Sequence, residues 1–332
     1  MNEQIKSRFS AEILAEAVRL YGTSPDGVRL LGDFDSFVYD FAQGGRDYIL
    51  RISHSSVRSP SLVKGELDWL THLVAGGASV CGVVPSVSSN LLEEIKDGHG
   101  GTFVAAVFHK AEGTSPKRGE WTPERMNQYG KMLGRIHRLS LGYLPSRQEW
   151  VRPAWDHPVI LNLEGTLSRL GDQKRVLDEF GELISEISAF PKDEDSYGLI
   201  HQDAHGANLT IDLSGRIRLF DFFDCAYSWY INDIAIVLFY AAMWEKDRAA
   251  FTDVFMSHFL AGYTSECEIE TDWLAKIPQF LKLREIDLYA VILREFGENW
   301  DTDPWNAGYM EGRKECIEQR IPYIEYDFVR LV

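Results

Sequence analysis

The spacing of apolar residues changes along the chain, and each change predicts a different structure. Residues 11–21 carry apolar side chains at the intervals of an amphipathic helix, as does the segment 61–74. Between and after these segments, apolar and polar residues alternate and glycine-containing turns intervene, a pattern typical of antiparallel strands. Strands are predicted at 28–30, 36–41, 48–52, 90–96 and 102–109.

Beyond His109 the helical spacing dominates. Thr122-Pro123-Glu124 has the order of an N-cap, a first-turn proline and an acid that suits the helix dipole. Residues 143–158 contain several prolines and predict an irregular connection, and further helices are predicted at 173–190, 234–263 and 273–296. We therefore predict an α+β fold with a small antiparallel sheet in a first lobe, residues 1–108, and a mostly helical second lobe, residues 109–332.

One short hairpin interrupts the helical part of the chain. In residues 209–211 and 217–219 apolar and other residues alternate, so that the apolar side chains of both segments face the same side. Leu213-Ser214-Gly215 supplies a turn between them. Pairing of these two segments brings Asn208 and Asp221 close together, because they flank the hairpin on its two strands.

Asp203, Asn208 and Asp221 are side chains that phosphoryl transfer needs. Asn208 follows Asp203 by five positions and Asp221 follows Asn208 by thirteen. The same offsets separate the base and the two metal ligands in kinase catalytic segments. Asp203 can accept the proton of a substrate hydroxyl, while the other two offer oxygen ligands to the Mg²⁺ that carries nucleotide phosphates. A polar turn on a solvent-facing hairpin is the structural alternative.

Composition limits the possible partners. The 332 residues are 45% hydrophobic and 25% charged, and the net charge of −16 repels nucleic-acid phosphates and anionic lipid surfaces. We therefore expect a globular protein that binds neither nucleic acid nor membranes, whereas cationic small molecules suit its charge. No apolar run approaches the roughly 20 residues that span a bilayer.

The cysteines Cys81, Cys225, Cys267 and Cys316 lie far apart in the chain. Without paired spacing they disfavour both a disulfide framework and a zinc site. The N-terminal residues are polar and lack the apolar segment of a secretory signal. We expect reduced thiols in a cytoplasmic protein, and the sequence indicates no oligomeric state.

The motif residues resemble those of the aminoglycoside phosphotransferase and choline kinase-like family, small-molecule relatives of protein kinases. His201-Gln-Asp-Ala-His-Gly-Ala-Asn208 is similar to the family's His-Gly-Asp-x-His-x-x-Asn loop, and Leu219-Phe-Asp-Phe-Phe-Asp224 is similar to its Ile-Asp-Phe-Asp strand. Gln202 stands where the family usually has glycine. The resemblance implies a bilobal protein-kinase-like fold and an ATP- or GTP-dependent kinase that uses Mg²⁺.

The resemblance also implies particular nucleotide-binding residues in the first lobe. It requires a cation on the third strand that reaches the nucleotide phosphates, and Arg51 takes that place instead of the usual lysine. Glu66, on the following helix, is then its expected partner. The turn that contains Gly32 and Ser36 would cover the phosphates, although an ordinary hairpin turn explains it as well. Arginine at this place also occurs in members similar to homoserine kinase type II and the bacterial stress response kinase.

The acceptor is expected to be a small molecule with a hydroxyl group. By the resemblance, its pocket lies between the catalytic loop and the C-terminal helices. Candidate contacts are Tyr227, Trp229, Arg284, Tyr289 and the acidic segment 295–303. A solvated helix end explains the acidic segment equally well. Aminoglycosides, amino alcohols, homoserine and sugars remain open as acceptors, as do protein serines in a stress-response type of protein kinase.

Two other functions are compatible with parts of the motif. His201, Asp203 and His205 form a His-x-Asp-x-His pattern that, with a later aspartate, could ligate zinc or manganese in a hydrolase. That hypothesis explains neither Asn208 nor the first lobe. A nucleotide-binding scaffold without catalysis is the second possibility, and Asp203 argues against it because binding alone needs no base.

Several neighbouring residues have structural interpretations. His201 and His205 are expected to shape the loop rather than take part in chemistry. Asp233 resembles a family position that braces the catalytic segment. Asp224 either touches a second metal ion or caps a turn.

Overall fold

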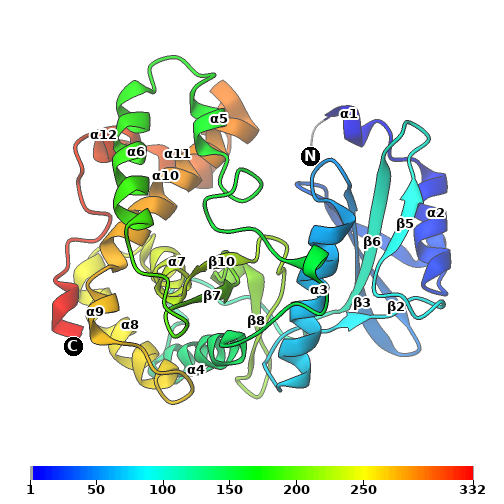
Figure 1. Ribbon diagram of the computed structural model, residues 1–332, viewed down its shortest axis with the longest axis horizontal. Helices are drawn as coiled ribbons and strands as arrows, with labels where there is room; N and C mark the ends of the chain where they lie inside the picture. The colour runs from blue at the N-terminus through cyan, green and yellow to red at the C-terminus, as the bar shows by residue number, and fades with distance from the viewer. Residues whose placement is uncertain (1–2, 332) are drawn as a thin grey trace. The chain divides into compact units, whose positions relative to one another are not determined.

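The computed structural model describes residues 3–331 and divides the chain into two compact units (Figure 1). Unit 1 contains the chain up to Ser115 together with Tyr143–Arg152 and Asn208–Cys225. Unit 2 contains Pro116–Gly142, Pro153–Ala207 and the chain from Ala226 onward. The hairpin that carries Asn208 and Asp221 therefore belongs to the same unit as the N-terminal sheet. A functional boundary after residue 108 stays a prediction.

Unit 1 is built on antiparallel strands in the order β1-β2-β3-β6-β4, with β5 also paired to β6. Its strands are β1 Val28–Gly32, β2 Phe37–Gln43, β3 Arg46–His54, β4 Val83–Val84, β5 Glu93–Lys96, β6 Thr102–His109, β8 Leu209–Ile211 and β9 Ile217–Leu219. Its helices are α1 Glu3–Lys6, α2 Ala11–Leu20 and α3 Pro60–Ala75, with short 3₁₀ turns at Pro25–Gly27 and Gln148–Trp150. The antiparallel meander predicted from the alternating pattern is thus confirmed.

The two faces of this sheet are covered by different helices. Figure 1 shows α2 and α3 on opposite sides of it, and each helix contributes to its own apolar cluster. Leu50 and Ile52 of β3 face the α2 side. Because successive residues of a strand point to opposite faces, Arg51 lies on the α3 side.

The β8–β9 hairpin has the register that its alternation predicts. Leu209 pairs with Leu219 and Ile211 with Ile217, and all four side chains are buried. Gly215 has φ +83°, which suits glycine in the turn. Leu219 also donates its N–H to the Ser79 carbonyl oxygen at 3.0 Å, so the hairpin is fastened to the rest of unit 1.

Unit 2 is mostly helical. Its helices are α4 Pro123–Ser140, α5 Leu163–Leu167, α6 Lys174–Ser188, α7 Tyr230–Ala242, α8 Arg248–Tyr263, α9 Thr271–Leu274, α10 Ile277–Phe296, α11 Pro304–Met310 and α12 Arg313–Glu318. The strands β7 Tyr197–Ile200 and β10 Ala226–Trp229 pair antiparallel. Short 3₁₀ turns occupy Gly206–Asn208, Gly297–Thr302 and Phe328–Leu331. Thr122 caps α4 through its hydroxyl and Pro123 follows in the first turn, as the sequence predicts.

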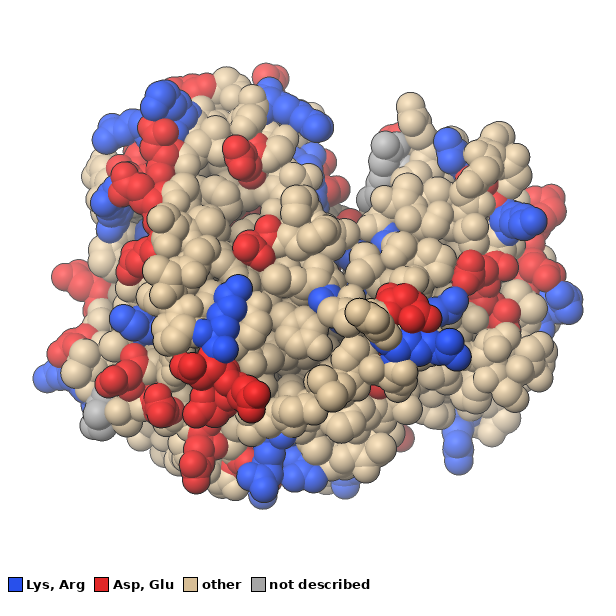
Figure 2. All heavy atoms as spheres, in the orientation of Figure 1, with Lys and Arg blue, Asp and Glu red and all other residues tan. Residues whose placement is uncertain are grey.

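Within residues 3–331, no helix combines the length and apolar character that crossing a membrane requires. On the face shown in Figure 2, acidic and basic side chains are interspersed with uncharged surface. This mixed surface accompanies the net charge of −16.

Candidate active site

Arg51 and Glu66 form a buried ion pair in unit 1. Glu66 lies on the buried face of α3 with Val63 and Leu67, opposite the face of β3 that presents Arg51. Arg51 Nη2 is 2.6 Å from Glu66 Oε2, and the two side chains are only 7% and 1% exposed. Burial opposes the charge of Arg51, but the Glu66 carboxylate outweighs that effect and raises the pKa of the guanidinium. The pairing expected from the sequence is therefore present.

Arg51 is also held between two aromatic rings. Its guanidinium carbon lies 4.9 Å from the ring centre of Phe108 and 4.7 Å from that of Phe223. Arg58 lies over the Phe223 ring as well, at 4.8 Å, and donates to the Asp224 carboxylate at 2.5 Å. We call this series of five side chains the arginine–phenylalanine stack. Cation–π contacts and a fixed guanidinium plane restrict Arg51 to one orientation.

Asp221 and Asn208 lie at neighbouring ends of the hairpin. Phe220 donates its N–H to the Asn208 carbonyl oxygen at 2.9 Å, so Asp221 directly follows the residue that is hydrogen-bonded to Asn208. Asp221 has φ +64°, a strained conformation for a residue other than glycine, and such strain is often found at functional sites. Its Oδ1 lies 3.7 Å from Arg51 Nη1.

Arg152 fixes the irregular segment that follows Asp221. Arg152 is 3% exposed, and its guanidinium donates to the carbonyl oxygens of Phe223 and Cys225, at 2.8 Å each, and of Leu62 at 2.7 Å. One side chain thereby joins the segment after Asp221 to α3. Asp224 accepts from Arg58, and its two expected roles, contact with a second metal ion or capping of a turn, stay predictions.

The turn after β1 carries the two residues predicted to cover the phosphates. Gly32 ends β1, beside a register shift between β1 and β2, and no atom lies within 4 Å of the position that a Cβ would take there. Ser36, immediately before β2, is 8% exposed. The open space at Gly32 is compatible with a close approach by phosphate, and the covering role stays a prediction.

In unit 2, Asp233 braces the catalytic loop. Its two carboxylate oxygens accept the backbone N–H groups of His201 and Gln202, each at 2.8 Å, and Oδ2 also lies 3.2 Å from His137 Nε2. Asp233 and His137 are fully buried. This arrangement confirms the predicted bracing role of Asp233 and fixes the backbone immediately before Asp203.

Asp203 is contacted by two cationic or polar donors. Its Oδ1 accepts from Arg284 Nη2, and its Oδ2 lies 3.2 Å from His205 Nε2. Burial alone would raise the pKa of Asp203, but His205 and Arg284 outweigh burial and hold that pKa well below its usual value. The carboxylate is therefore ionised at neutral pH, with its side chain 23% exposed.

The two histidines of the loop are committed to its backbone. His201 Nδ1 accepts the N–H of Asp203 at 3.2 Å, and His205 Nδ1 accepts the N–H of Ala207 at 3.1 Å. Both rings therefore carry their proton on Nε2 when neutral. Across the described part of the chain, no three histidine, cysteine or acidic side chains converge as a metal site. The hydrolase hypothesis has no support in this arrangement.

Arg284 links the loop to two helices of unit 2. Its Nη2 and Nε donate to the Tyr240 hydroxyl at 2.7 and 3.2 Å, and its Nη1 donates to Asp287 at 3.0 Å. The sequence predicts Arg284 as a substrate contact, whereas it predicts no role for Tyr240 or Asp287. Tyr240 lies in a continuous apolar run, where nothing local distinguishes its hydroxyl from a core tyrosine.

The other three candidate substrate residues are buried or half-buried in unit 2. Trp229 is completely buried among aromatic rings and donates its indole N–H to the Pro191 carbonyl oxygen at 2.7 Å. Tyr289 is 4% exposed and donates to Gln173 at 3.1 Å. Tyr227 is half-buried in β10. The burial of Trp229 argues against contact with a substrate.

Comparison with known proteins identifies the family. The sequence profile of the phosphotransferase enzyme family matches residues 26–269. A protein from Bacillus subtilis (strain 168), amicoumacin kinase, is 36% identical over 337 residues, which cover 100% of this chain and 99% of that protein. The chain belongs to the phosphotransferase enzyme family.

Solved structures agree with membership of the phosphotransferase enzyme family. The amicoumacin kinase hAmiN, in complex with AMP-PNP, Ca²⁺ and Ami, superposes with a TM-score of 0.93 and 32% identity over 100% of both chains. A microcompartment-associated aminopropanol kinase matches with a TM-score of 0.75 and 22% identity, covering 94% of this chain and 98% of that chain. The second likeness shows the fold alone. The predicted kinase-like α+β fold and phosphotransferase activity are confirmed.

Gln202 occupies the place where this phosphotransferase family usually has glycine, and its φ is +71°. A left-handed conformation costs roughly 1–2 kcal/mol for a residue with a Cβ. The Gln202 side chain partly offsets this cost by accepting from Asn232 Nδ2 at 3.1 Å. We expect Gln202→Gly to be more stable than Gln202→Ala by about 1 kcal/mol, since both lose the hydrogen bond and only alanine keeps the strain. Urea unfolding of the two variants tests this, and equal stability would contradict it.

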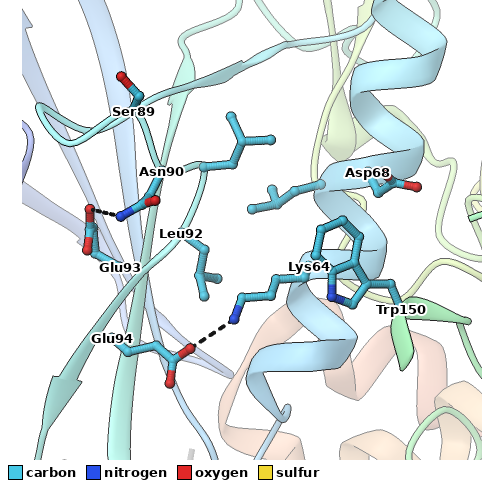
Figure 3. A pocket seen from close by; sticks show the side chains of 10 residues that line it. Lys64, Asp68, Ser89, Asn90, Leu92, Glu93, Glu94 and Trp150 are labelled. Carbon is cyan, nitrogen blue, oxygen red and sulfur yellow. Dashed lines mark hydrogen bonds and ion pairs between the residues drawn. The ribbon is translucent and has the colours of Figure 1, made fainter. Parts of the chain in front are cut away.

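A separate cavity of about 480 Å³ lies beside α3 in unit 1 (Figure 3). Its walls include Leu67, Leu92 and Trp150, and its charged residues are partnered: Lys64 binds Glu94 at 3.0 Å. None of the predicted site residues lines it.

Proposed function

We propose that the protein transfers the γ-phosphate of ATP to a hydroxyl group of amicoumacin or a close analogue. The observation that carries this proposal is the likeness to two amicoumacin kinases along the whole chain, at 36% identity to one and a TM-score of 0.93 to the other. The aminopropanol kinase likeness, at 22% identity, does not extend to the acceptor.

Each unit supplies one part of the proposed chemistry. In unit 1, Arg51 presents its guanidinium to phosphate oxygens and stays in place because Glu66 and the arginine–phenylalanine stack hold it. In unit 2, Asp203 orients the acceptor hydroxyl and accepts its proton. The acceptor oxygen forms a bond to the γ-phosphorus as the bond to the bridging oxygen breaks, and ADP leaves.

The residues near Asp221 fit a hard divalent cation. Asn208 and Asp221 offer amide and carboxylate oxygens, the ligands that Mg²⁺ prefers, and Arg51 at 3.7 Å compensates the Asp221 charge within the same unit. When bound, Mg²⁺ would neutralise charge on the nucleotide phosphates. Asn208 and Asp221 would hold it, as the sequence predicts, with remaining positions left to phosphate oxygens and water.

The test is a direct assay of acceptors. Purified protein is incubated with ATP, Mg²⁺ and amicoumacin, and the product is examined for the added mass of one phosphoryl group. Parallel reactions contain 1-amino-2-propanol, an aminoglycoside, homoserine or a serine-containing peptide, and a GTP arm tests the nucleotide. Phosphorylation of another acceptor but not amicoumacin would overturn the acceptor assignment. Stoichiometric zinc retained through dialysis, with no transfer to any acceptor, would favour the hydrolase instead.

A further inference from the structure

Three residues of unit 2 hold the guanidinium of Arg284. The Tyr240 hydroxyl accepts from two of its nitrogens, at 2.7 and 3.2 Å, and Asp287 accepts from a third at 3.0 Å. The remaining contact is the donation from Nη2 to Asp203. Its side chain is 15% exposed and lies over the Tyr240 ring, 5.2 Å from the ring centre.

The Tyr240 ring contacts Arg284 and His205, and these two residues also contact Asp203. The ring of His205 lies 4.5 Å from that of Tyr240, on which Arg284 also rests. Burial raises the pKa of the Tyr240 phenol to about 12 although the Arg284 charge opposes that rise, so the hydroxyl stays neutral at working pH. The phenol therefore accepts from Arg284 as an uncharged group, and the carboxylates of Asp203 and Asp287 balance the arginine.

We propose that Arg284 is a positioning residue that sets the orientation of the Asp203 carboxylate for the acceptor hydroxyl. This inference rests on the proposed function, because that function makes Asp203 the base. It replaces the sequence-based interpretation of Arg284 as a substrate contact, since the donors of its guanidinium are directed to groups of unit 2. A long arginine side chain normally loses rotamer freedom when it binds, and here that loss has already occurred in the folded protein.

Position matters more than base strength in this reaction. Phosphoryl transfer has a loose transition state in which the protein contributes chiefly alignment and electrostatics. The positive charge of Arg284 weakens Asp203 as a base. Arg284 therefore raises the transfer rate only if the fixed orientation of the carboxylate contributes more to the rate than the lost basicity removes. A misplaced catalytic group can cost roughly a hundredfold in rate.

The decisive variant is Arg284→Ala, assayed with the acceptor that the wild type phosphorylates. We expect kcat to fall roughly a hundredfold while the KM for ATP stays within about twofold, because the nucleotide-holding residues belong to unit 1. Millimolar guanidinium chloride should restore part of kcat, whereas urea at the same concentration should not, since urea has a similar planar shape and no charge. Arg294→Ala is the matched control, because Arg294 lies on the same helix, half-exposed, and pairs with its neighbour Glu295.

Tyr240→Phe gives a second, milder test, since it keeps the ring and removes the hydroxyl. We expect a smaller loss of kcat with an unchanged thermal midpoint. A rise in the acceptor KM with kcat unchanged in Arg284→Ala would overturn the proposal and make Arg284 a substrate contact. A loss of kcat that guanidinium does not restore, together with a lower thermal midpoint, would also overturn it. An inactive wild type would instead refute the proposed function.

Discussion

Asp203→Asn is expected to lower kcat by about 10²–10⁴-fold while leaving the KM for ATP nearly unchanged. The amide has almost the same shape and can still accept from Arg284, but it cannot take the proton of the acceptor hydroxyl. Asp203 belongs to unit 2, whereas Arg51 and Asp221 belong to unit 1, so nucleotide binding should not depend on this carboxylate. Single-turnover rates at saturating acceptor, together with ATP titrations, measure the two effects separately.

Asp287→Asn is the comparison for this prediction. It removes the other carboxylate that binds Arg284 and leaves the proposed base intact. We expect its kcat to fall far less than that of Asp203→Asn. If Asp203→Asn kept kcat within about threefold of the wild type, Asp203 would not be the base.

Arg51→Met is expected to destabilise the protein by about 3–5 kcal/mol and to remove transfer activity. The substitution leaves Glu66 charged and completely buried without its partner, and that is the costly way to break a buried ion pair. The substitution also removes the guanidinium that contacts the rings of Phe108 and Phe223. Chemical unfolding measures the first effect and kcat/KM for ATP the second.

The double variant Arg51→Met with Glu66→Leu separates stability from function. Replacing both charges with apolar side chains removes the buried unpaired carboxylate, so much of the lost stability should return. Activity should not return, because phosphate would still meet no cation at position 51. A double variant that regained both stability and activity would show that Arg51 has only a structural role.

The features predicted correctly from sequence depend on short-range pattern. The alternation in residues 209–219 determines the hairpin register, which the structure confirms. The fixed offsets from Asp203 point to Asn208 and Asp221 as metal ligands, and that role stays a prediction. Arg51 follows from the family resemblance, which requires a cation on the third strand, and the alternating pattern predicts where that strand lies. Its pairing with Glu66 followed from the family resemblance, and the contact is present at 2.6 Å.

The features that sequence did not predict depend on contacts between distant segments. The Phe223 ring contacts Arg51 and Arg58, which lie far from it in the sequence. The Tyr240 ring likewise contacts both His205 and Arg284. No spacing rule connects such positions. Trp229, which is completely buried, shows a second reason, because an aromatic residue near a motif has the same sequence signal whether it lines a pocket or fills a core.

The arginine at position 51 has a consequence for chemical probes of nucleotide-binding enzymes. Reagents that acylate an amine beside bound nucleotide depend on a lysine at the place that, under the proposed function, Arg51 takes here. A guanidinium stays protonated at any usable pH and is not a nucleophile. Held between Phe108 and Phe223, with a pKa raised further by Glu66, it gives such reagents no amine to acylate at this position. A survey of active kinases based on lysine labelling would overlook this protein at that position even while it turned over substrate.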